Sequence, residues 1–143
     1  MSGPDVWGPH GWKFIHYVTL GYPFNPTEEE KNKYRFFFYN LDTIIPCAIC
    51  GNNYSKHLKM KPLTDEILNN RTKMIEWGID MHNLVNIEHN KKIISYDEGK
   101  EMILQNTKDC KYVETFDNKS NHIIIVLVVI ILIQFMILAN RKN

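Results

Sequence analysis

A long run of aliphatic side chains near the C-terminus constrains the fold of this chain more than any other feature. The run covers Ile123–Ala139 and is interrupted only by Gln134. As a helix, about 17 residues at about 1.5 Å each span about 26 Å, the short end of what crosses a bilayer. Polar residues that suit the membrane interfaces flank the run, His122 before it and Arg141 after it. A buried core helix would turn a polar face to water, and this run has none. We therefore predict a transmembrane helix over 122–139.

The residues before this run suffice for one folded domain, because roughly 110 residues can bury one hydrophobic core. The formal net charge of +1 argues against a nucleic-acid binder that acts through bulk positive charge. Three cysteines are too few for a disulfide scaffold. The first residues, MSGPDVWGPHGW, contain neither a basic n-region nor an apolar h-region. We therefore expect a single-pass, tail-anchored membrane protein whose domain faces the cytosol.

Helical spacing recurs through the domain, and strand patterns are almost absent. Thr27 and Glu30 match a capping box, as do Ser95 and Glu98, and Pro46 suits the first turn of a helix. Helices are expected over about 6–20, 27–43, 47–59, 70–88 and 95–106. Because they are short and closely connected, we predict an all-α fold, a four-helix bundle plus a short fifth helix. The expected parts are a domain over 1–107, a polar linker over 108–121, the membrane helix over 122–139 and a short polar tail over 140–143.

Cys47 and Cys50 are separated by two residues in the segment CAIC. This spacing allows a disulfide within one helical turn, and a helix N-terminus stabilises the thiolate that exchanges disulfides. Half of a zinc site is an alternative, but a structural site needs four ligands and the sequence has no second such pair. A thioredoxin-type motif needs a βαβ context, and these flanks are helical. Two buried packing cysteines are the remaining interpretation.

Polar side chains gather on one face of the helix expected over 70–88. His82 and Asn86 share that face, and Asn83 lies beside Asn86. Buried polar groups need partners, so the cluster indicates a polar network between helices, a solvated patch, or the wall of a site for a nucleotide-like ligand. Trp12 and His16, four residues apart, stack either as an aromatic core pair or as the lining of a flat pocket.

Taken together, these segments form a specific pattern: WGPxxWxxxH from Trp7, PCxxC from Pro46, and WxxxxHNxVN from Trp77. In order and approximate separation the pattern resembles the Erv/ALR family of FAD-linked sulfhydryl oxidases, from Trp7 to about Asn106. It is most similar to the branch encoded by large cytoplasmic DNA viruses. The resemblance implies a helical bundle with FAD at its mouth, paired as a homodimer, with no metal ion.

The resemblance also implies roles for individual residues. Cys50 would lie against the isoalloxazine, and Cys47 would receive electrons from a dithiol protein or a thioredoxin-like carrier, with O₂ as the final acceptor and H₂O₂ as product. Tyr96 is a looser match than the others, to an aromatic residue near the adenine. A virus that assembles in the cytosol, with virion or host intracellular membranes for the anchor, has a use for such an enzyme. The residues implied to bind the cofactor are Gly8, Trp12, His16, His82, Asn83, Val85, Asn86, Lys91 and Tyr96.

This sequence departs from the family pattern at several positions. Ile79 stands where many relatives carry a cysteine bonded to a second one, and His89-Asn90 replaces a common Leu-Gly before Lys91. Cys110 stands alone in the expected linker, either as an idle thiol, which we favour, or as an electron relay. A non-enzymatic tail-anchored adaptor and a zinc-binding module are the alternative functions.

Overall fold

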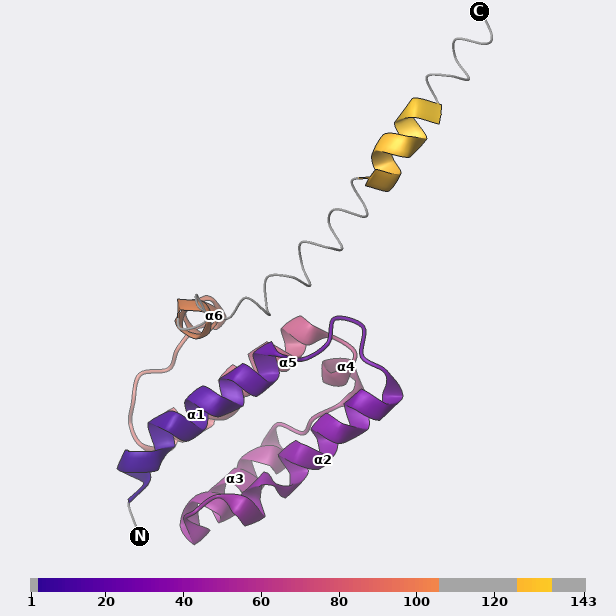
Figure 1. Cartoon of the computed structure of the whole chain (residues 1–143). Helices are drawn as coiled ribbons and strands as arrows, with labels where there is room; N and C mark the ends of the chain where they lie inside the picture. The colour runs from indigo at the N-terminus through magenta and orange to yellow at the C-terminus, as the bar shows by residue number, and fades with distance from the viewer. Residues whose placement is uncertain (1–2, 106–125, 135–143) are drawn as a thin grey trace, which may run out of the picture. The chain divides into compact units, whose positions relative to one another are not determined.

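The computed structural model of the chain describes residues 3–105 and 126–134. The chain divides into two units, Met1–Asn106 and Thr107–Asn143, and each is described by itself. The described residues of the first unit form helices and no strand, so the predicted all-α class is confirmed (Figure 1). The helices are α1 (Pro4–Leu20), α2 (Glu28–Ile44), α3 (Ala48–Met60), α4 (Asp65–Leu68), α5 (Arg71–Glu88) and α6 (Tyr96–Gln105).

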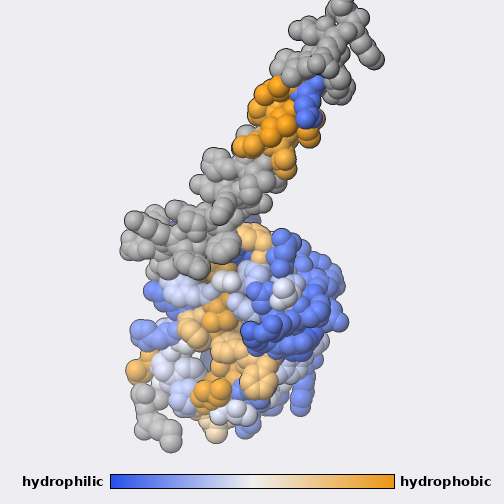
Figure 2. Space-filling model, turned by 45° about the vertical axis from the view of Figure 1, so that its right-hand side comes forward, coloured by the Kyte–Doolittle hydropathy of each residue, from blue (hydrophilic) through white to orange (hydrophobic). Residues whose placement is uncertain are grey.

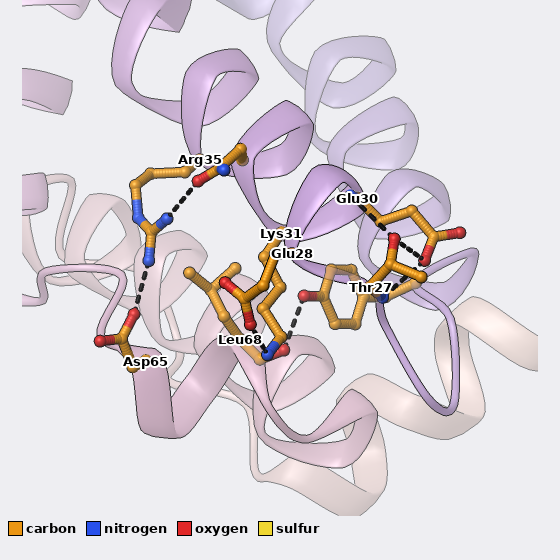
Figure 3. Close-up of polar contacts among 9 residues, drawn as sticks. Thr27, Glu28, Glu30, Lys31, Arg35, Asp65 and Leu68 are labelled. Atoms are coloured by element: carbon orange, nitrogen blue, oxygen red, sulfur yellow. Dashed lines mark hydrogen bonds and ion pairs between the residues drawn. The ribbon is translucent and has the colours of Figure 1, made fainter.

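Both predicted capping boxes are confirmed, and they explain where two of the helices begin. At the start of α2 the Glu30 N–H donates to the Thr27 hydroxyl at 3.2 Å, and the Thr27 N–H donates to the Glu30 carboxylate at 2.8 Å (Figure 3). Ser95 and Glu98 exchange the equivalent pair of hydrogen bonds before α6. Each box satisfies backbone donors that the first helical turn leaves without a partner.

Two predictions about helix boundaries need correction. Helix α3 begins at Ala48, and Cys47 is its N-cap, because the Cys50 N–H donates to the Cys47 sulfur at 3.2 Å. Pro46 therefore precedes the cap and does not stand in the first turn. The short helix α4 was not expected from the periodicity, although its N-cap Thr64 is a residue type that begins helices.

Helices α1 and α2 run antiparallel, as their aromatic contacts show. Phe14 meets Phe37 edge-on at 6.2 Å, and Tyr22 meets Tyr34 edge-on at 4.6 Å. Tyr22 follows the last residue of α1 by two positions, so the end of α1 leads toward earlier residues of α2 than its middle faces. Short connections between packed helices commonly give this antiparallel arrangement.

Helices α2 and α3 also run antiparallel, and their backbones approach closely. The Tyr54 hydroxyl donates to the Phe38 carbonyl at 3.0 Å. Nearer the connection, a Cβ placed on Gly51 would overlap the carbonyl oxygen of Asp42. Only glycine fits this position, one residue after Cys50, so the close approach fixes the start of α3 against the end of α2.

Helix α5 packs antiparallel to α1. Trp12 contacts His82, while farther along α1 a Cβ on Gly78 would press on the Thr19 side chain at 2.9 Å. The same helix runs antiparallel to α3, because Trp77 reaches the Lys61 carbonyl near the end of α3 and Glu88 reaches residues near its start.

The start of α1, the end of α2, the start of α3 and the end of α5 therefore meet at one end of the bundle, where the N-terminus lies in Figure 1. Arg35 ties α2 to α4 at the other end through an ion pair to Asp65 at 2.6 Å (Figure 3). The buried core between the helices consists of Tyr22, Phe38, Tyr54, Leu58, Leu63, Leu68, Met74, Trp77 and Met81.

The predicted membrane span lies in the second unit. Its residues 126–134 are helical with exposed side chains, and the rest of 122–139 lies outside the described residues. The predicted linker over 108–121 with Cys110, the domain boundary at 107 and the tail over 140–143 also lie outside them. Among residues 3–105 and 126–134, no helix is both long enough and apolar enough to cross a membrane.

Candidate functional site

An aromatic and imidazole cluster joins the middle of α1 to the second half of α5. The Trp12 indole stacks on the His82 imidazole, with ring centroids 4.4 Å apart and planes 7° from parallel. The expected stack of Trp12 on His16 is wrong: those rings are 6.0 Å apart and tilted by 35°. Helical spacing placed Trp12 and His16 on one face, but the ring that fits flat against the indole comes from the neighbouring helix.

His16 and His82 are joined by a hydrogen bond between Nε2 of His16 and Nδ1 of His82, 2.9 Å long. Only one of these two nitrogens carries the shared hydrogen, so the bond requires at least one neutral ring. His16 is 3% exposed, and its Nδ1 is buried with no partner among the described residues. A buried polar atom without a partner is costly, so this nitrogen is suited to hydrogen-bond a ligand.

Both imidazoles are neutral at pH 7. Burial, followed by the nearby His82, lowers the pKa of His16 to about 4, and burial, followed by the Lys91 charge, lowers the pKa of His82 to about 4. The cluster therefore presents an uncharged aromatic surface with hydrogen-bonding nitrogens at its edges. Such a surface suits a flat heteroaromatic ring.

Because these histidines are harder to protonate in the folded protein, acid should destabilise it. Between pH 6.5 and 4 the unfolded chain, with ordinary histidine pKa values, binds more protons than the folded one, so stability is complete above pH 6.5 and falls as pH drops through this window. We expect urea midpoints to decline from pH 6.5 to 5, above the range where carboxylates titrate. A double variant, His16→Gln with His82→Gln, should show a flatter decline. If the urea midpoints of the wild type and the double variant declined equally steeply with pH, the assignment of this pH dependence to His16 and His82 would be contradicted.

Gly8 lies one helical turn before Trp12 and faces open space. A Cβ placed on Gly8 would meet no atom of the described chain within 4 Å. Nothing in the packing of α1 therefore demands glycine here, and helices disfavour it. The indole nitrogen of the neighbouring Trp7 is buried without a partner among the described residues. Both observations are explained if a ligand approaches the backbone of this first turn.

The two asparagines of the α5 cluster differ in their surroundings. Asn83 is fully engaged: its amide donates to the Ile94 carbonyl at 2.8 Å and accepts from the Ile94 N–H at 3.0 Å. It holds the segment after α5 against the helix. Asn86 is buried, and among the described residues its side chain makes one long hydrogen bond, 3.5 Å to Asn83. Asn86 therefore retains capacity for a further partner.

The end of α5 explains the departure of His89-Asn90 from the family pattern. Asn90 has a φ of 53°, in the left-handed region that favours glycine, and asparagine is the residue that replaces glycine there most readily. The Lys91 N–H donates to the Asn86 carbonyl and the Asn90 N–H to the Ile87 carbonyl, the two bonds of a Schellman cap. Asn90 thus adopts the left-handed backbone conformation that the common glycine would adopt. This supports matching Lys91 to the lysine of the family pattern.

The structure brings most of the predicted cofactor residues to the same end of the bundle, with one exception. Tyr96 donates to the Asp80 carboxylate at 3.0 Å. Residues two apart on a helix do not share a face, so this contact places Tyr96 beside a different face of α5 from His82. Val85 is half-buried on α5.

Cys47 and Cys50 form a disulfide at the start of α3, with their Cα atoms 5.2 Å apart. Both cysteines are half-buried, and the side chain between them, Ile49, is 74% exposed. The disulfide is therefore accessible to a partner, and it lies at the end of the bundle where α5, the helix that carries His82 and Asn86, ends. Within residues 3–105 and 126–134, no group of three or more His, Cys, Asp or Glu side chains is placed to hold a metal ion.

Residues that periodicity did not single out also contribute to this end of the bundle. Glu88 contacts both Asn53 and His57 across the joint between α5 and α3. No local spacing links Glu88 to Asn53 or His57, so only the packing of the helices reveals the contact. Ile79, at the position of the missing cysteine, is fully buried and packs so tightly that a Cβ on Gly99 would overlap it. Packing thus joins α5 to α6 there.

Comparison with known proteins gives a consistent result. A family model described as the Erv1 / Alr family matches residues 9–108. A probable FAD-linked sulfhydryl oxidase of Acanthamoeba polyphaga mimivirus is 48% identical over 100 residues, which cover 70% of this chain and 70% of that protein. An FAD-linked sulfhydryl oxidase of African swine fever virus is 33% identical over 99 residues, covering 69% and 81%. The crystal structure of the yeast Erv1 core has the same fold, with a TM-score of 0.64 at 24% identity over 71% of this chain and 86% of that one.

Proposed function

The chain belongs to the Erv1/Alr family, and we propose that it is an FAD-dependent thiol oxidase that forms disulfide bonds in protein substrates and reduces O₂ to H₂O₂. The observation that supports this function is the position of the disulfide relative to the aromatic cluster. An accessible disulfide lies at the start of α3, at the end of the bundle where α5 ends, and the second half of α5 builds an uncharged aromatic wall with α1.

The residues at this end fit FAD. Trp12 and His82 offer a flat stacked surface, and Asn86 has unused hydrogen-bonding capacity. His16 Nδ1 is a buried atom in need of a partner, and Gly8 leaves room for a ligand beside α1. Lys91 supplies a positive charge near His82, which suits a phosphate-bearing cofactor.

The protein chain carries out the thiol chemistry. A substrate thiolate attacks the Cys47 sulfur, the Cys47–Cys50 bond breaks, and Cys50 leaves as a thiolate. A second substrate thiolate then attacks the substrate sulfur of the mixed disulfide, which releases Cys47 and leaves the substrate oxidised. The start of α3 stabilises the thiolates because its N–H groups and dipole favour negative charge. When bound, FAD accepts the two electrons from the dithiol and passes them to O₂.

Oxygen consumption tests this function. The purified protein should consume O₂ in the presence of dithiothreitol and release one H₂O₂ for each dithiol oxidised. A flavin-loaded protein that consumes no O₂ with dithiothreitol or with a reduced dithiol protein would refute the proposal. We further propose that the physiological substrate is a dithiol protein or a thioredoxin-like carrier that supplies disulfides to virion proteins, in line with the viral relatives.

Gly8→Ala should separate folding from cofactor binding. Alanine in place of glycine stabilises a helix interior by roughly 0.5–1 kcal/mol, and the added Cβ meets nothing in the protein chain. We expect the apoprotein to melt at a slightly higher temperature while the holoprotein loses flavin faster on dialysis. Gly3→Ala, whose Cβ also enters open space before α1, is the matched control and should retain flavin. Full flavin retention by Gly8→Ala would remove Gly8 from the cofactor site.

We propose that residues 122–139 anchor the protein in a virion or host intracellular membrane with the domain in the cytosol. The support is the aliphatic run, in which each residue contributes a few tenths of a kcal/mol to insertion against the cost of Gln134. Removing Asn121–Asn143 should release an active, flavin-loaded protein from membranes into the soluble fraction of cells. With the intact chain, protease added outside sealed microsomes should digest the domain. Protection of the domain would place it in the lumen and refute the cytosolic orientation.

We also propose that the protein forms a homodimer. Large apolar side chains are exposed on the first two helices, including Phe14 at 57% and Phe36 at 73%. Figure 2 shows apolar side chains gathered in a band on one face of the domain, beside a strongly hydrophilic face. Exposed apolar surface of this kind marks interfaces between proteins. Sedimentation equilibrium measures the state directly, and a monomer at micromolar concentration would refute the dimer.

A further inference from the structure

A single carboxylate connects the helix that carries the disulfide to the helix that carries the aromatic wall. Glu88 is the last residue of α5. Its Oε2 accepts a hydrogen bond from the Asn53 amide at 3.2 Å, and its Oε1 lies 3.0 Å from Nε2 of His57. Asn53 and His57 both belong to α3, so Glu88 spans the joint between the two helices with both of its oxygens engaged.

The contacted face of α3 is the face that carries Cys50. Cys50, Asn53 and His57 follow one another at intervals of three and four residues, which places them in one row along the helix. On α5, Glu88 shares a face with Val85, which lies three residues before it, and precedes the Schellman cap that fixes Lys91. The Glu88 carboxylate therefore lies between two parts of the site. One is the row of α3 residues that continues from Cys50, and the other is the end of α5, the helix that carries His82 and Asn86.

We propose that Glu88, with His57, is a positioning residue that holds Cys50 at its working distance from the flavin. This inference rests on the proposed function, since it assigns a role within the same site. Electron transfer from the Cys50 thiolate requires α3 and α5 to keep a fixed register, and a displacement near 1 Å can cost about a hundredfold in rate.

The contacts between α3 and α5 oppose a sliding movement of one helix along the other. His57 is 4% exposed, and its Nδ1 has no partner among the described residues, so the 3.0 Å contact of its Nε2 with Glu88 is the polar contact that the described residues give this buried ring. Asn53 is oriented by a second contact, because its Oδ1 accepts from Lys56 at 3.3 Å. Breaking the bond to a buried imidazole leaves a polar group uncompensated, which is costly. A shift of α3 along α5 would break both bonds to Glu88 together.

The test uses a spectroscopic signal of the distance between Cys50 and the flavin. In the full chain with Cys47→Ser, purified in mild detergent, Cys50 is a free thiolate and should donate charge to the oxidised flavin, giving a long-wavelength absorbance band. Adding Glu88→Ala should weaken that band at least threefold while flavin content is retained. In the chain with both cysteines, Glu88→Ala should slow anaerobic flavin reduction by dithiothreitol by about tenfold or more.

Rescue and control variants separate positioning from general stability. Glu88→Gln keeps an oxygen that can accept from His57 and should restore most of the band and of the rate. Glu76→Ala is the matched control, because Glu76 is also an α5 carboxylate, its side chain is 27% exposed against 35% for Glu88, and it pairs with Lys100 of α6 at 2.7 Å. Glu76→Ala should lower the melting temperature to a similar extent and leave the band unchanged.

Three results would overturn the inference. These are an unchanged band and rate in Glu88→Ala, an equal loss in Glu76→Ala, or failure of Glu88→Gln to recover either signal. Should Glu88→Ala not fold, Asn53→Ala removes one of the two bonds and should weaken the band about twofold, and no change would count against the joint. A Cys47→Ser protein with flavin but no band would refute the assigned role of Cys50 itself, and a protein without flavin would refute the proposed function.

Discussion

Replacing Cys50 with serine should abolish the oxidation of dithiothreitol while the flavin stays bound. Without the Cys50 sulfur the disulfide cannot form, and no thiolate remains on the face of α3 that points to the end of α5. Disulfide exchange and electron donation both require that thiolate, so turnover should fall to the background rate of free flavin. Oxygen consumption at saturating dithiothreitol measures this. Near-normal consumption by Cys50→Ser would contradict the assigned chemistry.

Cys47→Ser is the matched control because it also removes the disulfide but keeps the Cys50 sulfur. It should be equally inactive, yet its free Cys50 should produce a long-wavelength absorbance band with the oxidised flavin. Cys50→Ser should lack that band. The reverse pattern would exchange the roles of the two cysteines, with Cys47 beside the flavin.

Replacing His82 or Asn86 with alanine should release the flavin. His82→Ala removes the ring that stacks on Trp12 and leaves Nε2 of His16 without its partner. Asn86→Ala removes a buried amide with unused hydrogen-bonding capacity. Polar groups of a bound nucleotide lose roughly 1–3 kcal/mol for each partner removed, which corresponds to a Kd about 5- to 150-fold weaker.

Flavin fluorescence during titration of the apoproteins measures these affinities. Thr72→Ala, an exposed position at the opposite end of α5, is the control and should bind flavin normally. If both His82→Ala and Asn86→Ala bound flavin with wild-type affinity, this face of α5 would not be part of the cofactor site. Loss in the Thr72 control would point to a general defect of the helix.

The fold was largely predictable because the main helices carry local start signals. Thr27 with Glu30 and Ser95 with Glu98 are complete capping boxes within four residues, and the structure forms both. Helix α4 was missed because four residues are too few for a periodic pattern. The sequence does not reveal Cys47 as an N-cap, because cysteine is not among the residue types that commonly begin helices, whereas proline is typical of a first turn.

The sequence predicted which residues form the site better than it predicted which of these residues contact one another. Spacing identified Trp12, His16 and His82, yet the stacking partner of Trp12 depends on how α1 packs against α5. Asn90 looked like a departure until its left-handed backbone showed it to replace glycine. The bonds of Glu88 to α3 join residues more than thirty positions apart, and no local pattern carries such information.

The visible spectrum of the purified chain under anaerobic dithiothreitol tests the central claim most directly. We expect a yellow protein with flavin absorbance at about 450 nm, lost on addition of excess dithiothreitol and restored when O₂ is admitted. A colourless protein would contradict cofactor binding. A yellow protein whose absorbance does not change with dithiothreitol would contradict the transfer of electrons from the Cys47–Cys50 pair to the flavin.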